Sequence, residues 1–447
     1  MKNTLLTVLA ALLLWAAPAR AQVAFDQHFE NATLRLDYIF AGDCSHQAIY
    51  LRQLYRTPVW AGRRTHLEEP LLRGNGQIRV LDPQTGECLY ANSFSSLFQE
   101  WTVTPEAKHT QKAFESTFQI PFPKHPVNVE VYTLDIYGKA SARTVHPVDP
   151  ADILIRPVED NGLVTLTVWE GGAPEEVVDV VIVSEGYDAS EAFKFFKDAY
   201  RAADALFSHE PFASYKQRFA VRAVFAASAQ SGVSVPHEGK WRSTATSSHF
   251  DTFYSDRYLT TSSVWHIADL AGTVPYEHVI VLANTDTYGG GGIYNHLTIM
   301  NSDHATFVPV LVHEFGHAFG GLGDEYAYGS GSDNQYPEGV EPWEPNITTL
   351  AAFDTKWADM LPAGVPVPTP VDDLDKQDVR RIWNTFTPKQ KAQLNYKLGV
   401  YEGAGYQEKG VYRPVQECRM RINECEDFCP VCTRAIIRMI EYYTQTQ

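Results

Sequence analysis

Residues 313–326 read HEFGHAFGGLGDEY, and this stretch restricts the fold of the chain more than any other. His313 and His317 are four residues apart, so on a helix they share one face and can both direct an imidazole nitrogen at one Zn²⁺ ion. Glu314 lies beside them, where a carboxylate reaches the water at the metal and can take its proton as a general base. The pattern therefore predicts a helix that carries two metal ligands and a catalytic base.

The flanking residues favour a buried helix that ends at a glycine-rich turn. The run TFVPVLVHEFGHAF is mostly apolar, as expected for a helix inside a domain, and Ser302 and Asp303 offer caps at its start. The glycines at 320, 321 and 323 end the helix and let the chain fold back. Asp324 or Glu325 can then approach the ion as a third ligand, which leaves a fourth position open for water.

The HExxH spacing on its own has a simpler interpretation. Two histidines and a glutamate can meet this spacing by chance, as a hydrogen-bonded histidine pair on a half-buried helix. The glycine turn and the acidic pair that follow are far more restrictive, because few other structures need all of these features together. The whole stretch therefore favours a metal site.

Composition and charge limit the classes of partner. The chain has 447 residues, of which 44% are hydrophobic and 12% aromatic, enough for two packed domains. Lys and Arg number 37 against 54 Asp and Glu, which gives a formal charge of −17. Such a balance disfavours a general phosphate-binding surface. We therefore expect no nucleic-acid partner.

The first residues, 1–21, have the pattern of a secretory signal peptide. They combine Lys2, an apolar run from Leu5 to Ala17 and small residues at 19 and 21, which predicts cleavage before Gln22. A retained membrane anchor is the alternative, but the run is too short to span a bilayer comfortably, and we see no other stretch long enough. We expect a soluble protein that is secreted or periplasmic, without an integral membrane segment after cleavage.

The six cysteines suit an oxidising compartment. Cys44 and Cys88 are the two in the first half of the chain, and they could pair with each other. The other four crowd into fifteen residues near the end, at Cys418, Cys425, Cys429 and Cys432. Their spacing permits disulfides, which we favour in an exported protein, or a structural Cys₄ zinc site.

The order of the patterns predicts an α+β protein with more than one domain. Residues 22–148 show short alternating runs broken by turn residues, as in an antiparallel β-sandwich. The segment HPVDPAD, 146–152, reads as a linker. Residues 149–447 then show buried strands, a helix over 190–207 and the HExxH helix, which predicts a mixed sheet with an active-site helix and an edge strand where a peptide can add.

Four consecutive glycines at 289–292 do not predict a phosphate loop, because no GK[ST] pattern follows them. We expect instead a flexible rim beside the cleft or a plain hairpin turn.

Several stretches resemble the IgA-peptidase family of zinc metallopeptidases, metallopeptidase family sixty-four. They are the HExxH stretch, VIVSEGY, FDTFYSDRYLTT at 250–261, YEGAGYQEKGVYRP, CRMR and FCPVC. The resemblance covers most of residues 150–447, and the preceding β-domain is similar to the N-terminal domain that members often carry.

The resemblance implies that His313 and His317 bind zinc, that Glu314 is the base and that Asp324 is the third ligand. It also implies that Met420 forms a floor beneath the metal, as in a metzincin-like domain, against the alternative of an ordinary core methionine. In the usual metzincin pattern the third ligand falls six residues after the second histidine, where this chain has Gly323. Glu325 therefore stays an alternative.

Three functions follow from these patterns. The leading one is an exported zinc endopeptidase that acts on peptides or proteins, in which Tyr412 is a candidate hydrogen-bond donor to the reacting carbonyl oxygen or simply a structural tyrosine. A zinc amidase acting on cell-wall peptides keeps the metal and changes the bond. A non-catalytic binding or adhesion module on a peptidase scaffold would have little need of Glu314. The sequence sets neither the substrate nor the oligomeric state.

Overall fold

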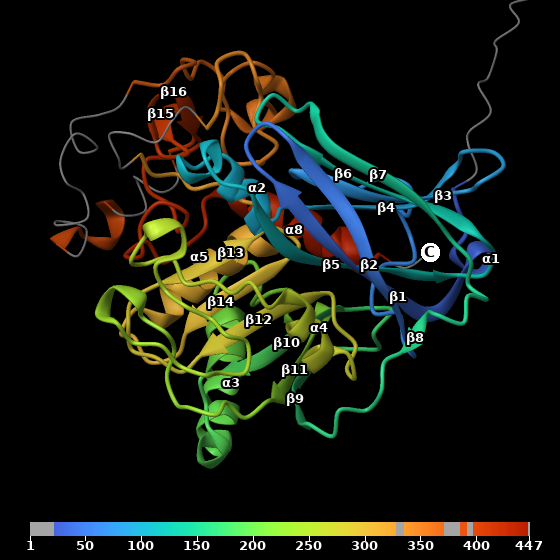
Figure 1. The fold of residues 1–447 in the computed structure, drawn as a ribbon. Helices are drawn as coiled ribbons and strands as arrows, with labels where there is room; N and C mark the ends of the chain where they lie inside the picture. Colours follow the sequence, from blue (N-terminus) through green and yellow to red (C-terminus); the bar gives the residue numbers. More distant parts are fainter. Residues whose placement is uncertain (1–21, 328–334, 371–384, 391–396, 446–447) are drawn as a thin grey trace, which may run out of the picture.

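The computed structural model describes residues 22–327, 335–370, 385–390 and 397–445 (Figure 1). The predicted signal peptide lies outside these residues. No helix in the described ranges is long and apolar enough to cross a bilayer. The molecule is a mixed α+β structure built around several sheets, which confirms the predicted class.

The N-terminal part contains two four-stranded sheets. One has the order β5-β1-β2-β8 and the other β4-β3-β6-β7. The strands are β1 (Phe29–Gly42), β2 (Gln47–Thr57), β3 (Gly76–Leu81), β4 (Cys88–Phe94), β5 (Lys112–Pro123), β6 (Val127–Leu134), β7 (Ala140–Val148) and β8 (Arg156–Pro157). Two short helices accompany them, α1 (Phe25–His28) and α2 (Leu97–Thr102).

One hydrophobic core joins these two sheets. Alternate residues of β1, such as Leu34, Leu36 and Phe40, are fully buried and belong to the same cluster as Val129 and Val131 of β6. The alternation follows from the two-residue period of a strand, which points every second side chain at the core. The short strand β8 pairs with β2, so this sheet includes residues beyond the predicted linker.

The C-terminal part is built on a six-stranded mixed sheet, as expected. Its order is β13-β14-β12-β10-β11-β9, with β10, β11, β12 and β14 parallel and the two edge strands antiparallel. The strands are β9 (Val164–Glu170), β10 (Val178–Glu185), β11 (Phe219–Phe225), β12 (His278–Ala283), β13 (Gly290–Ile293) and β14 (Leu297–Asn301).

Helices cover both faces of this sheet. α3 (Ala192–Phe207), α5 (Phe307–Ala318) and α8 (Pro430–Thr444) supply the core on one face, and α4 (Val264–Ala271) packs on the other. A hairpin of β15 (Tyr401–Ala404) and β16 (Gln407–Arg413) lies apart from the main sheet (Figure 1). Central strands buried on both faces explain the continuous apolar runs in the sequence.

The glycine run forms edge strand β13 rather than a flexible rim or a turn. β13 pairs antiparallel with β14, and on its outer side Tyr258 forms an isolated bridge with Gly290. The expected edge strand therefore exists beside the HExxH helix, but residues 250–261 already cover part of it.

A buried glutamate at the end of β10 fixes the segment that reaches this edge. The Glu185 carboxylate accepts hydrogen bonds from the backbone N–H groups of Thr246 (2.6 Å) and Ser248 (2.9 Å). These bonds compensate the cost of burying the charge. They hold the loop that leads into residues 250–261, so the VIVSEGY stretch supports the site from a distance.

Candidate metal centre

Helix α5 carries the HExxH residues on one face and a phenylalanine core on the other. Phe315 and Phe319 stack with ring centroids 5.4 Å apart, and both rings pack against Phe212. The helix begins at Phe307 with Thr306 as its N-cap, so Ser302 and Asp303 are not its caps; Ser302 is buried in the loop after β14. This packing fixes the helix while its opposite face holds the histidines.

The structure brings His313, His317 and Asp324 together. The Nε2 atoms of the two histidines are 3.0 Å apart, and Asp324 Oδ1 lies 3.1 Å from Nε2 of His313 and 3.3 Å from Nε2 of His317. These side chains are between 7% and 15% exposed. Glu325, the alternative third ligand, points away from these three side chains and towards Cys418, Cys429 and Cys432.

Backbone carbonyls orient both imidazole rings. His313 Nδ1 lies 3.0 Å from the carbonyl oxygen of Arg419, and His317 Nδ1 lies 2.6 Å from that of Leu322. A carbonyl oxygen only accepts, so both rings donate Nδ1–H, and in the neutral tautomer each presents its Nε2 lone pair to Asp324. This is the usual arrangement around metal-binding histidines.

The turn after α5 places Asp324. Gly321 has a φ of +62°, which a glycine adopts without strain, and the turn is then held by Asn346. Asn346 Oδ1 accepts from the Gly323 N–H (2.7 Å), and its Nδ2 donates to the Gly323 carbonyl oxygen (2.9 Å). A Cβ on Gly323 would lie 2.9 Å from Ile347 Cδ1, so this backbone passes close to its neighbour.

The electrostatics of His313, His317 and Asp324 favour a positive charge among their ligand atoms. Burial alone would raise the pKa of Asp324, but His317 and His313 hold it well below its usual range. Burial likewise opposes protonation of His317, yet the Asp324 carboxylate raises the pKa of that imidazole to about 9. A divalent cation among the three ligand atoms would supply the same charge.

The three ligand atoms have the spacing that zinc needs. Tetrahedral zinc with Zn–N and Zn–O bonds of about 2.0–2.1 Å sets its ligand atoms about 3.3 Å apart. The separations of 3.0–3.3 Å agree, and Asp324 Oδ1 is a buried oxygen without a well-aligned hydrogen bond in the described ranges. Two nitrogens and one carboxylate oxygen fit a catalytic zinc with an open position.

The Glu314 side chain of α5 lies against the glycine-rich strand β13. A Cβ on Gly290 would approach Glu314 Cγ to 3.3 Å, and one on Gly292 would lie 2.2 Å from the Glu314 carbonyl oxygen. Burial raises the pKa of the Glu314 carboxyl above its ordinary value, while the neighbouring His313 and His317 act in the opposite direction. The glutamate is thus packed beside the ligands without sharing their hydrogen bonds.

Two tyrosines missed by the sequence reasoning support Asp324. The Tyr406 hydroxyl donates to Asp324 Oδ2, and the Tyr326 hydroxyl donates to that of Tyr406 over 3.3 Å. Tyr412, the predicted candidate, instead sits on β16, where its backbone pairs with Thr348. Tyr406 lies in the turn between β15 and β16, within the YEGAGYQEKGVYRP stretch that resembles the family, but nothing in that stretch indicates a contact with Asp324.

Met420 packs beneath α5 at Gly316, a residue that lies between His313 and His317 in the chain. Its side chain is fully buried, and its sulfur would be 3.0 Å from a Cβ on Gly316. The Met420 carbonyl oxygen accepts from the Glu325 N–H over 2.9 Å. The methionine segment therefore contacts both the helix and the turn that carries Asp324.

The N-terminal part also reaches this region. Glu100 of α2 accepts a hydrogen bond from the Tyr258 hydroxyl. Burial raises the pKa of the Glu100 carboxyl to about 7, with Tyr258 and His317 lowering it and Glu314 raising it further. In Figure 1, α2 lies close to β13 and α5. A carboxyl from outside the C-terminal part is therefore within electrostatic reach of the base, which the sequence did not indicate.

The structure forms none of the disulfides that the sequence favoured, since all six cysteines are free in it. Cys44 lies in the β1–β2 loop, where its N–H bonds to Ala107, whereas Cys88 begins β4 of the other sheet. Among the last four, Cys418, Cys429 and Cys432 cluster with Glu325, and Cys425 is outside that group. The Cys₄ set that the spacing also permits is not formed either, because Cys425 lies outside the cluster.

Comparison with known proteins gives the family. The model for the IgA Peptidase M64 family matches residues 166–440, and the model for the Peptidase M64 N-terminus matches residues 24–144. A search of curated proteins finds no match. The first model covers more than half of the chain. The chain therefore belongs to the IgA Peptidase M64 family and is a metallopeptidase, a metal-dependent hydrolase that acts on peptide bonds.

Proposed function

We propose that this protein is an exported, zinc-dependent endopeptidase in which His313, His317 and Asp324 hold the ion. The observation that carries the proposal is the meeting of three ligand atoms within 3.3 Å of one another. Both histidines are held by carbonyls in the tautomer that a metal requires. Three protein ligands with an open position are typical of catalytic zinc rather than structural zinc.

Glu314 is the general base in this proposal. When bound, zinc supplies Lewis acidity towards the scissile carbonyl and the attacking water. Glu314 takes the proton from that water and later hands it to the leaving amine. A carboxyl whose pKa is raised by burial is suited to both transfers, because it accepts a proton more readily than an exposed glutamate.

The surrounding residues keep the ligands in place. The carbonyls of Arg419 and Leu322 orient the two imidazoles, and the Tyr406 hydroxyl orients the carboxylate of Asp324. Ligands held in this way need little rearrangement when substrate arrives.

The finer architecture belongs to the same proposal. We place an N-terminal β-sandwich in residues 22–148, supported by the core that both four-stranded sheets share. We place a metzincin-like catalytic domain in residues 149–447, supported by Met420 beneath the helix. Export to the periplasm or the exterior is supported by the sequence of residues 1–21 alone.

Hydrolysis of an unbiased peptide library tests the proposal, with products identified by mass spectrometry. We expect the purified protein to cut internal peptide bonds. We expect Glu314→Gln to lower kcat by about 10²–10⁴-fold, the range that general-base catalysis contributes, and to keep its zinc. Zinc content is measured on both proteins, because loss of zinc would make loss of activity uninformative about the base.

Two results would count against the proposal. Undiminished cleavage by Glu314→Gln would remove the glutamate from the mechanism. Wild-type protein that binds no zinc, or whose zinc content is the same after His317→Ala, would remove the histidines from the metal site.

A further inference from the structure

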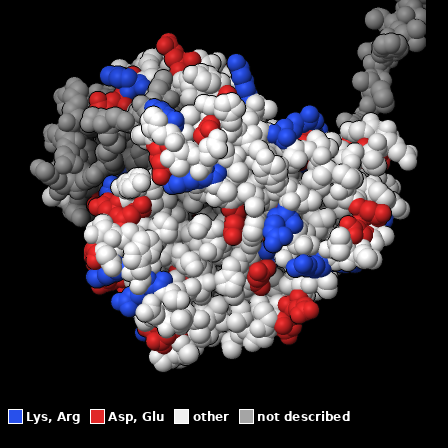
Figure 2. Space-filling view, in the orientation of Figure 1, with Lys and Arg blue, Asp and Glu red and all other residues white. Residues whose placement is uncertain are grey.

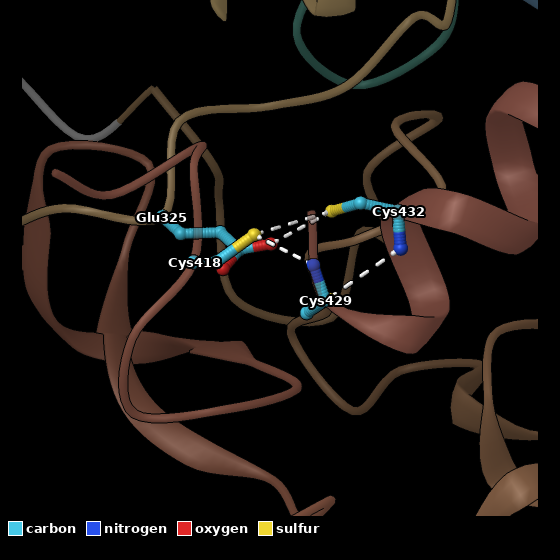
Figure 3. Close-up of side chains that lie close together, drawn as sticks. All are labelled: Glu325, Cys418, Cys429 and Cys432. Atoms are coloured by element: carbon cyan, nitrogen blue, oxygen red, sulfur yellow. Dashed lines mark hydrogen bonds between the residues drawn. The ribbon is translucent and has the colours of Figure 1, made fainter. Parts of the chain in front are cut away.

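A second group of ligand-type side chains lies on the other side of the Asp324 turn. It consists of Glu325, Cys418, Cys429 and Cys432, whose ligand atoms all lie within 4.8 Å of one another (Figure 3). All four side chains are buried, the most exposed at 2%. Figure 3 shows them converging from the turn, the CRMR segment and the start of α8.

The separations match ligands of one ion rather than a covalent pair. Cys418 Sγ and Cys432 Sγ are 3.9 Å apart, and Cys432 Sγ is 3.1 Å from Glu325 Oε1. Tetrahedral zinc with Zn–S bonds of about 2.3 Å sets two sulfurs about 3.8 Å apart. A disulfide would need about 2.05 Å, roughly half of the observed separation.

The start of α8 favours thiolates at this place. Cys429 is the N-cap residue, and Pro430 and the following residues form a helix that ends at Thr444. The Cys429 N–H donates to Cys418 Sγ over 3.3 Å, and the Cys432 N–H donates to Cys429 Sγ over 3.5 Å. Backbone N–H groups at a helix N-terminus stabilise negative charge on sulfur.

Glu325 has a buried oxygen that lacks a partner. Its Oε1 accepts from Asn346 Nδ2 over 2.9 Å, but within the described ranges its Oε2 has no hydrogen bond. A fully buried carboxylate is costly unless a cation or donors satisfy it, so this oxygen points to a bound cation.

We propose that Glu325, Cys418, Cys429 and Cys432 bind a second zinc ion, which is structural. Four protein ligands close a tetrahedral site and leave no position for water or substrate. Thiolates select a soft or borderline metal, and zinc accepts the mixed sulfur and oxygen set. Cys425 is outside the site, because its sulfur faces the carbonyl oxygen of Asp427 at 3.5 Å.

This second ion would position the catalytic ligands. Glu325 directly follows Asp324, and Cys418 directly precedes Arg419, whose carbonyl oxygen orients His313. The Glu325 N–H already donates to the Met420 carbonyl oxygen. A metal held by Glu325 and Cys418 would lock these segments together and to α8. It acts through other residues and does not touch substrate.

Cobalt substitution of the purified protein tests the site without relying on activity. Thiolate ligands give Co²⁺ a sulfur-to-metal charge-transfer band in the near ultraviolet, whereas the His313, His317 and Asp324 set contains no sulfur. We expect this band in wild type, in His317→Ala and in the control Cys425→Ser. We expect it to be lost in Cys429→Ser.

Zinc content of the same proteins gives a second measurement. We expect two zinc ions per wild-type chain, and one in either His317→Ala or Cys429→Ser. A thiol-specific mercurial should release one of the two from wild type, which tests the site even if Cys429→Ser does not fold.

Absence of the charge-transfer band in cobalt-loaded wild type would overturn the proposal. So would alkylation and mass spectrometry that found Cys418, Cys429 or Cys432 in a disulfide. A different result would separate the two sites: wild type and His317→Ala each hold a single zinc, and both give the cobalt band. That result would support the structural site and contradict the proposed catalytic site.

Discussion

Asp324 and Glu325 are neighbours in the chain, yet their carboxylates join different groups of side chains. The segment after α5 has no helical repeat, so consecutive side chains point to opposite sides. Asp324 turns towards the histidines and Glu325 towards the cysteines. The sequence could offer both as ligands but could not choose between them, because the choice depends on how Asn346 and Ile347 hold Gly323.

Tyr406→Phe should weaken the metal centre without unfolding the protein. The change removes the hydroxyl that donates to Asp324 Oδ2. Loss of such a supporting hydrogen bond lowers metal affinity or activity by about 10–100-fold. Zinc affinity and kcat/KM are the measurements. Tyr442→Phe is the matched control, since it removes a tyrosine hydrogen bond to the Glu69 carbonyl oxygen (2.9 Å) outside the centre. Equal effects of the two changes would contradict the assigned role.

His278 should make the protein less stable in acid. Burial lowers its pKa to about 3, against an ordinary 6.5, and Phe319 and Tyr443 pack edge-on against its ring. Below pH 6.5, His278 binds a proton in the unfolded chain but not in the folded protein. The stability contributed by neutral His278 is therefore present above pH 6.5 and is lost as the pH falls towards 3, by up to about 1.4 kcal/mol per pH unit.

Urea unfolding between pH 7 and pH 4.5 measures this loss. We expect His278→Phe to show a smaller decrease in unfolding free energy with falling pH than wild type. The exposed His125, changed to Phe, is the control and should leave the slope unchanged. A His278→Phe slope equal to that of wild type would contradict the prediction.

Local sequence patterns predicted the helices and the central strands well. The helix expected over 190–207 is α3, and the expected HExxH helix is α5, because each has a strong apolar repeat. β13 could not be predicted, since four glycines have no apolar pattern. Its identity as a strand comes from pairing with β14, a contact that the local sequence does not encode.

Gly292→Ala should disrupt the contact between β13 and α5. A Cβ there would lie 2.2 Å from the Glu314 carbonyl oxygen, so either the strand or the helix must move. Overpacking of this kind costs about 1–3 kcal/mol, and movement of Glu314 should also lower kcat/KM. Gly172→Ala is the control, because its nearest neighbour is a Val177 methyl at 3.0 Å. Unchanged activity and thermal stability in Gly292→Ala would contradict this packing.

The N-terminal part packs directly on the C-terminal part. α8 runs through the middle of Figure 1, and its Tyr442 donates to the Glu69 carbonyl oxygen while Tyr443 packs against Phe319. On the face in Figure 2, the basic and acidic side chains are interspersed and do not gather into one basic patch. The sequence predicted two parts but not this packing, because it contains no local sign of which surfaces meet.

A buried arginine links the two parts. Arg35 of β1 is 2% exposed; it pairs with Asp37 (2.7 Å) in its own strand and with Asp269 (2.6 Å) of α4. It also donates to the carbonyl oxygen of Trp265 over 3.0 Å. The ion pair with Arg35 compensates the buried carboxylate of Asp37, whose side chain is only 3% exposed. Removal of the arginine would therefore leave a buried charge and break the contact with α4.

Arg35→Met should destabilise the protein by about 3–5 kcal/mol, the cost of breaking a buried ion pair from one side. Arg56→Met is the matched control, because Arg56 pairs with Glu30 at the surface, where both side chains are more than 40% exposed, and such pairs contribute about 0–1 kcal/mol. Chemical unfolding monitored by tryptophan fluorescence measures both. If the two parts depend on this contact, Arg35→Met should also separate one unfolding transition into two. Similar small losses in both variants would mean that Arg35 does not hold the parts together.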